Sequence, residues 1–208
     1  LGVFMPLAFS KFLSKTVLKG MPASFTLELP PFRRPQIGKV IVRSIFDRTL
    51  FVLGRAAAVA APAGLLIWIL ANVSIGGTTL LCGFTEMLDP FARMIGLDGV
   101  ILAAFILGFP ANEIVVPIII MTYMAGGSLI EIEGAQLLQL FTANGWTWIT
   151  AVSTILFSLM HWPCATTCLT IKKETGSLKW TLLSFLIPTV CGILICFLFT
   201  TAARLLFS

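Results

Sequence analysis

The stretch WTWITAVSTILFSLMHWPCATTCLTI, residues 146–171, decides the fold of this protein. It holds 26 residues without one Asp, Glu, Lys or Arg, and about 20 apolar residues suffice for a helix to cross a bilayer. Its second half contains Pro163, which removes a helical hydrogen bond and clashes with the preceding turn. Non-helical backbone at membrane depth is tolerated only where it is buried in protein or lines a watery cavity. The stretch therefore predicts a membrane helix that is interrupted beside a cavity.

A second segment repeats this pattern. Residues 100–125 are uncharged apart from Glu113, and the sequence GFPANE, residues 108–113, interrupts them at their midpoint. Paired apolar segments that are both interrupted are the best indication in a sequence of a transport site. The two breaks together predict a transporter.

Two further apolar segments, residues 56–73 and 180–203, carry no charge and bring the apolar segments to almost half of the 208 residues. The whole sequence is 58% hydrophobic and only 11% charged, whereas a soluble domain has about 25% charged residues. This composition excludes a soluble globular domain, a disordered chain and a disulfide-rich scaffold. We predict an all-α fold, a polytopic membrane helical bundle with discontinuous or re-entrant helices.

The charged residues predict an orientation in the membrane. Nine of the 14 Lys and Arg residues lie in residues 11–55, which the positive-inside rule places in the cytoplasm. Within them, residues 37–46 have the spacing of an amphipathic helix on the membrane surface, and residues 80–95 predict a second amphipathic helix, with an acidic face. The outer loops are expected to hold five acids: Glu86, Asp89, Asp98, Glu131 and Glu133.

The path of residues 100–125 decides where three lysines lie. If this segment crossed the membrane fully, Lys172, Lys173 and Lys179 would face outward, against the positive-inside rule. If it enters and returns as a re-entrant hairpin that turns near Pro110, the lysines face the cytoplasm. We favour the hairpin over the full crossing.

Glu113 is the first candidate for a functional residue. An ionisable side chain at membrane depth costs roughly 2.5 kcal/mol or more and is a functional hypothesis by default. The alternative is that Glu113 lies in water at the hairpin tip, or caps a helix beside Asn112. A half-helix that starts there directs its N-terminal dipole at the carboxylate, and an ionised carboxylate suits a cation.

The second break supplies sulfur and nitrogen ligands. Cys164 and Cys168 share one face of a regular helix, and with His161 they suit a divalent metal such as Fe²⁺ or Zn²⁺. The alternative is that Cys168 is a small buried residue and that His161 lies at a helix–helix contact. Thr166 and Thr167 offer hydroxyls, although threonines in membrane helices usually bond the carbonyl four residues back. One histidine and scattered cysteines do not make a closed structural zinc site.

Several motifs resemble one transporter family. The sequence FTLELPPFRRP, residues 25–35, resembles the ELPPYRxP signature of the bacterial ferrous-iron transport protein B family. GFPANEIVV, residues 108–116, is similar to its GFxAKEVVV element. PCAT, residues 163–166, followed by KKETGSLKW, residues 172–180, is similar to its PCxAT…RRETGSxKW element. The order and spacing agree along essentially the whole chain.

This resemblance implies Fe²⁺ uptake by a multi-pass protein of the bacterial cytoplasmic (inner) membrane. It implies that residues 1–54 hold the end of a truncated membrane helix and a basic cytoplasmic linking region. Residues 55–208 would then form the second gate-type, nucleoside-recognition-like transmembrane domain and the C-terminal membrane helix. In the family an N-terminal GTP-binding domain and a first gate precede this part, so the chain is expected to be a fragment or one product of a split gene. Fe²⁺ is then the transported substrate, no cofactor is bound tightly, and GTP acts only through the preceding domain.

The resemblance also assigns residues and partners. The family's gate cysteine corresponds to Cys164 and its intramembrane glutamate to Glu113. Asn112 replaces a common lysine, which leaves the carboxylate freer to meet metal, and His161-Trp162 replaces tyrosine- or threonine-like residues. The implied partners are membrane lipid, the G domain and first gate, and small cytoplasmic accessory proteins of the iron system. A homo-oligomer is left open, and nucleic acid is not expected.

Two other functions stay open at this point. One is a gate-type transporter of another solute, nucleoside-like or another divalent metal, and the other is a non-transporting membrane scaffold for a GTPase. Aromatic and amide groups at the hairpin tips would favour an organic solute, whereas a cysteine there favours a metal. An enzyme is not expected, because no nucleophile–base pair with an orienting group is visible.

Overall fold

The computed structural model describes residues 50–124 and 134–207, with a few positions before them (7, 8, 10, 11, 14, 15 and 38). The chain divides into two units, Leu1–Arg48 and Thr49–Ser208, and the elements below belong to the second. The surface helix predicted at residues 37–46 lies outside the described residues, except for Gly38. The outer acids Glu131 and Glu133 also lie outside them.

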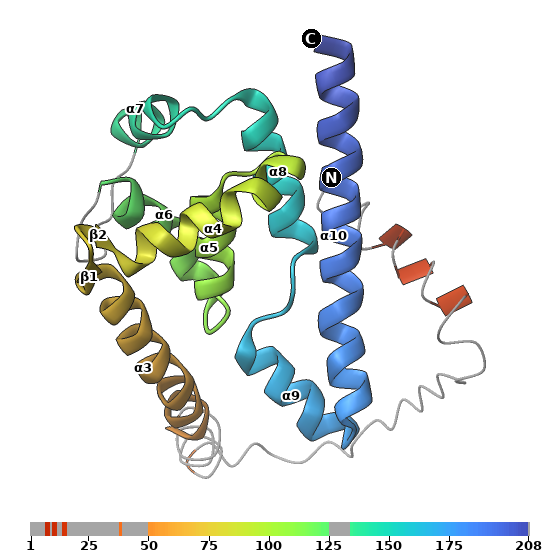
Figure 1. Ribbon diagram of the computed structural model, residues 1–208. Helices are drawn as coiled ribbons and strands as arrows, with labels where there is room; N and C mark the ends of the chain where they lie inside the picture. Colours follow the sequence, from red (N-terminus) through yellow and green to blue (C-terminus); the bar gives the residue numbers. More distant parts are fainter. Residues whose placement is uncertain are drawn as a thin grey trace. The chain divides into compact units, whose positions relative to one another are not determined.

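The second unit is built almost entirely of helices (Figure 1). In chain order its described elements are α3 (Phe51–Asn72), β1 (Ser74–Ile75), β2 (Thr78–Thr79), α4 (Leu80–Met94), α5 (Gly99–Leu107), the 3₁₀ turn η2 (Asn112–Ile114), α6 (Val115–Tyr123), α7 (Ala135–Ala143), α8 (Trp148–Met160), α9 (Ala165–Thr175) and α10 (Leu178–Phe207). The two strands pair as one short antiparallel hairpin. The all-α fold predicted from composition is confirmed.

Helices α4 and α5 form a sharply bent pair. Thr79 starts α4, because its side-chain oxygen accepts a hydrogen bond from the Cys82 amide at 3.2 Å. The chain bends by 109° between the two helices, and Gly96 in the turn has a φ of +77°, a left-handed conformation that glycine adopts readily. Gly99 permits the close approach of α5 to α4, since a Cβ there would lie 2.1 Å from the Thr85 carbonyl oxygen.

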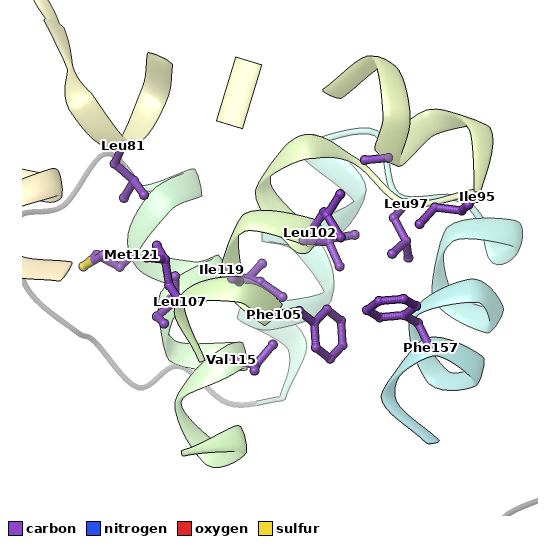
Figure 2. Packing of buried hydrophobic residues seen from close by; sticks show 14 of the residues in the cluster. Leu81, Ile95, Leu97, Leu102, Phe105, Leu107, Val115, Ile119, Met121 and Phe157 are labelled. Carbon is purple, nitrogen blue, oxygen red and sulfur yellow. The ribbon is translucent and has the colours of Figure 1, made fainter. Parts of the chain in front are cut away.

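Helices α5 and α6 lie at the centre of the core. Most of their residues are buried, and Ile101 on α5 and Ile118 on α6 are at most 1% exposed. Figure 2 shows Phe105 of α5 facing Phe157 of α8, and their ring centroids are 4.9 Å apart in an edge-to-face arrangement. A helix that is apolar on all sides is typically buried, and the neighbours of this pair enclose it.

Two helical segments in the described part of the chain are long and apolar enough to cross a membrane, Trp148–Thr175 and Leu178–Leu206. A third is added if the bent pair α4 and α5 counts as one broken span, and Ala56–Asn72 is a shorter apolar helix. The apolar segment predicted at residues 180–203 is confirmed as part of one continuous helix, α10, about 45 Å long. Leucines exposed along it, such as Leu186, Leu194 and Leu198, suit contact with lipid.

Candidate functional site

The first break separates α5 from α6. Helix α5 ends at Leu107, the chain turns through Gly108 and Pro110, and α6 begins at Val115. Two backbone hydrogen bonds shape the turn, from the Ala111 amide to the Gly108 carbonyl at 3.0 Å and from the Ile114 amide to the Ala111 carbonyl at 3.2 Å. The interruption predicted near Pro110 is confirmed.

The two ends of this segment lie together. Asp98 caps the start of α5 and accepts a hydrogen bond from the hydroxyl of Tyr123, the last residue of α6. The indole nitrogen of Trp146, just before α8, donates to the same Tyr123 oxygen at 2.8 Å. Each arm has nine residues and is therefore about 13 Å long, less than half of a bilayer core of about 30 Å. The segment therefore folds back on itself as a helical hairpin, the shape predicted for a turn near Pro110.

Charged residues lie near both ends of α10. Lys172 lies in the last turn of α9 and Lys179 in the first turn of α10. At the far end of α10, about 37 Å along the helix, the Arg204 guanidinium donates to the Arg93 carbonyl at 2.8 Å. This contact places the end of α10 beside the turn between α4 and α5, with the acids predicted for the outer face.

The second break separates α8 from α9. Helix α8 ends at Met160 and α9 begins at Ala165. His161 has a ψ of 173° and Cys164 a ψ of 160°, so both flanking residues are extended. Figure 1 shows this extended segment between α8 and α9, and α10 packs against both helices. The interruption predicted from Pro163 is confirmed.

The two breaks meet through one backbone hydrogen bond. The Ala165 amide donates to the Phe109 carbonyl at 2.8 Å. Phe185 of α10 joins the same place, because its ring centroid lies 5.8 Å from that of Phe109 and 5.7 Å from that of Trp162, with which it is stacked. We call this contact the break junction, defined by Phe109, Trp162, Ala165 and Phe185.

An apolar cavity of about 460 Å³ adjoins the break junction. Its walls come from α4, α5, α8, α10 and both breaks. The lining residues are Leu88, Phe91, Leu102, Ile106, Phe109, Phe157, Trp162, Phe185 and Ile193. The two interrupted segments therefore meet beside a cavity with apolar, largely aromatic walls.

Cys164 lies at the start of α9 beside two hydroxyls. Its Sγ is 3.1 Å from Thr166 Oγ1 and 3.0 Å from Thr167 Oγ1. The two hydroxyls therefore lie against the thiol and not against the carbonyls four residues back. The reason is that α9 begins only at Ala165, so the residues four positions back lie outside the helix. A helix N-terminus carries partial positive charge, and the thiolate is the form of cysteine that binds metal.

The other predicted site residues lie apart from one another. Glu113 and Asn112 are exposed at the hairpin tip, and the Cys168 thiol donates to the Pro163 carbonyl at 3.6 Å. The His161 ring is half-buried between aromatic side chains. Within residues 50–124 and 134–207, no three His, Cys, Asp or Glu side chains are placed to hold one metal ion. The candidates are therefore not gathered into a closed metal site.

Two contributors to the junction were missed in the sequence. The Phe109 carbonyl was not singled out, because no side-chain type marks a backbone acceptor. Phe185 lies in an uninterrupted apolar helix, where one phenylalanine resembles the others. Only the structure, which places the two breaks in contact, identifies the Phe109 carbonyl and Phe185 as parts of the junction.

Two family models match the chain. The Gate model, described as nucleoside recognition, matches residues 53–178, and the model described as ferrous iron transport protein B C terminus matches residues 1–47. No solved structure matches.

Several curated relatives match almost the whole chain. A protein named Fe(2+) transporter FeoB from Staphylococcus aureus (strain MSSA476) is 29% identical over 96% of this chain and 30% of its own length. Proteins of the same name from Campylobacter jejuni and Methanocaldococcus jannaschii are 25% and 24% identical, over all of this chain and 36% and 32% of their own lengths. The chain thus spans about a third of the length of these relatives.

Proposed function

Because this chain belongs to the ferrous iron transport protein B family, we propose that it forms the C-terminal membrane part of a permease that imports Fe²⁺ across the cytoplasmic membrane. The observation that carries the proposal is the break junction, where the Ala165 amide bonds the Phe109 carbonyl at 2.8 Å. Non-helical backbone from two segments meets there, and Cys164 lies next to it. This is the arrangement that interrupted membrane helices adopt around a transport path.

The path begins at the face that carries the acids. A polar recess of about 310 Å³ is lined by Glu86, Asp89 and Asp98 among others, and such a surface raises the local concentration of cations. From there the ion reaches the hairpin tip with Glu113 and then Cys164 with its two threonine hydroxyls. These ligands act one or two at a time, which suits conduction, because an ion held by a closed set would not leave.

Energy and control come from outside this chain. GTP would act through an N-terminal G domain of the same transporter, transmitted by the basic linking region in residues 1–54. The first gate, membrane lipid and small cytoplasmic accessory proteins would be the other partners. The protein would be a multi-pass component of the bacterial inner membrane.

Iron uptake by variants of the complete transporter tests the ligand assignment. We expect Cys164→Ala and Glu113→Gln each to lower the initial rate of radiolabelled Fe²⁺ uptake by about tenfold, the change that the loss of about 1.4 kcal/mol of ion stabilisation produces. Cys191→Ala, which removes a half-buried thiol from α10, serves as the matched control and should retain the wild-type rate. Wild-type uptake by both ligand variants at normal expression would refute the assignment.

An organic solute is the second candidate, and the aromatic lining of the cavity next to the junction favours it. Aromatic walls suit stacking against a nucleobase-like ring. Competition separates the two functions in the same uptake assay. Excess Co²⁺ should inhibit Fe²⁺ uptake while a mixture of nucleosides should not, and the reverse pattern would favour the organic solute.

A further inference from the structure

One hydrogen bond fixes the ring of His161 at the second break. Its Nδ1 lies 2.8 Å from the carbonyl oxygen of Ser158. A carbonyl only accepts, so Nδ1 carries the proton and the neutral ring keeps a free lone pair on Nε2. Histidine ligands in metal sites are commonly held in this way, with one ring nitrogen donating to a backbone carbonyl and the other directed at the metal.

The Nε2 atom of His161 is buried and has no hydrogen-bond partner. Aromatic rings surround the imidazole, with centroids at 5.1 Å for Phe105, 6.0 Å for Trp162 and 6.3 Å for Phe157. The neighbouring Trp162 Nε1 is also buried without a partner. A buried polar group that is left without a hydrogen-bond partner is destabilising. The second break thus holds two adjacent buried polar groups without partners, and a rearrangement that exposed them would allow both to find partners.

We propose that His161 Nε2 is an ion ligand that becomes available when the second break opens, and that it takes a borderline divalent cation such as Fe²⁺. This inference rests on the proposed function and adds one ligand to it. Imidazole nitrogen suits Fe, Zn, Ni and Cu, whereas Mg and Ca prefer oxygen ligands. A neutral imidazole binds without releasing a proton, in contrast to the thiol of Cys164.

The position of His161 fits a transfer of the ion to Cys164. The two residues are three positions apart in an extended segment, so their Cα atoms are separated by at most about 11 Å. An ion can therefore exchange one ligand for the other with a short displacement. The aromatic cover over Nε2 keeps the ligand unavailable while the junction is closed.

Three substitutions in the complete transporter test the proposal. His161→Phe keeps an aromatic ring but removes both nitrogens, and His161→Asn keeps an amide that can bond the Ser158 carbonyl but lacks the Nε2 position. Both should raise the half-saturating concentration of Fe²⁺ about tenfold, the lower bound for disturbing a metal ligand shell. His161→Gln, whose amide oxygen reaches the Nε2 position, should restore most of the affinity.

The outcomes separate this proposal from the proposed function. If wild type and all three variants show the same half-saturating concentration, His161 is not a ligand. If His161→Asn behaves as wild type and only His161→Phe fails, the bond to Ser158 positions the break and the ligand role is wrong.

Co²⁺ absorption spectra of the purified transporter give a readout that does not depend on transport, since imidazole ligation should change the d–d bands in wild type and not in His161→Phe. Loss of that difference would overturn the proposal, whereas absence of Fe²⁺ uptake by wild type would overturn only the function.

Discussion

Replacing Ala165 by proline should lower the rate of Fe²⁺ uptake at least about tenfold, although α9 should still form. A displacement of about 1 Å between groups that must be aligned can lower a rate by more than this factor. Ala165 is the first residue of α9, a position where proline is favoured. Cys164 before it already has the extended conformation that a following proline requires, with φ −62° and ψ 160°. The substitution therefore removes one contact, the amide that donates to the Phe109 carbonyl.

The proline ring also occupies the space of the lost hydrogen. It would push the hairpin tip away from Cys164, so that the two segments no longer line one path. Ala165→Gly keeps the amide hydrogen and is the matched control, expected to remain close to wild type in the same uptake assay. Equal uptake by the proline variant and wild type, at equal expression, would show that the two breaks work independently.

Replacing Phe185 by alanine should make the protein leak divalent cations. Phe185 forms the ring contacts to both breaks, at 5.8 Å to Phe109 and 5.7 Å to Trp162. An aromatic pair contributes about 0.5–1.5 kcal/mol, so the two together stabilise the closed junction by about 2 kcal/mol, roughly 30-fold in the ratio of closed to open states. We expect Co²⁺ entry into proteoliposomes without nucleotide to rise by a comparable factor.

Phe197→Ala supplies the comparison for this leak. Phe197 lies on the same helix and is 40% exposed, so its loss should not change the Co²⁺ entry rate. A Phe185→Ala protein that stays as tight as Phe197→Ala would contradict the assignment of the aromatic contact as the seal. Thermal stability of both variants in detergent shows whether either has unfolded.

The two breaks could be predicted because their causes are local. Pro110 and Pro163 each interrupt an apolar segment, and the structure ends a helix shortly before each of them. The sequence also favoured the hairpin, since a full crossing would place three lysines after the second break on the outer face, against the positive-inside rule. The hydrogen bond between Asp98 and Tyr123 then confirmed that the ends of the segment meet.

The break junction could not be predicted because its contacts join distant parts of the chain. Nothing in the residues near Phe109 specifies that its carbonyl accepts from Ala165 and not from another amide. The sequence left the orientation of the Thr166 and Thr167 hydroxyls open for a related reason. It depends on the residue at which α9 begins, and only the packing of the break fixes that residue.

The most direct test of the account is protection of Cys164 from alkylation by the transported ion. In a transporter with Cys164 as the only thiol, a small water-soluble maleimide should react, and Fe²⁺ or Co²⁺ should slow the reaction by occupying the path. A matched protein with Cys191 as the only thiol, half-buried on α10, should react at a rate that the metal does not change. Reaction of Cys164 at the same rate with and without metal would contradict a path for iron at the meeting point of the two broken segments.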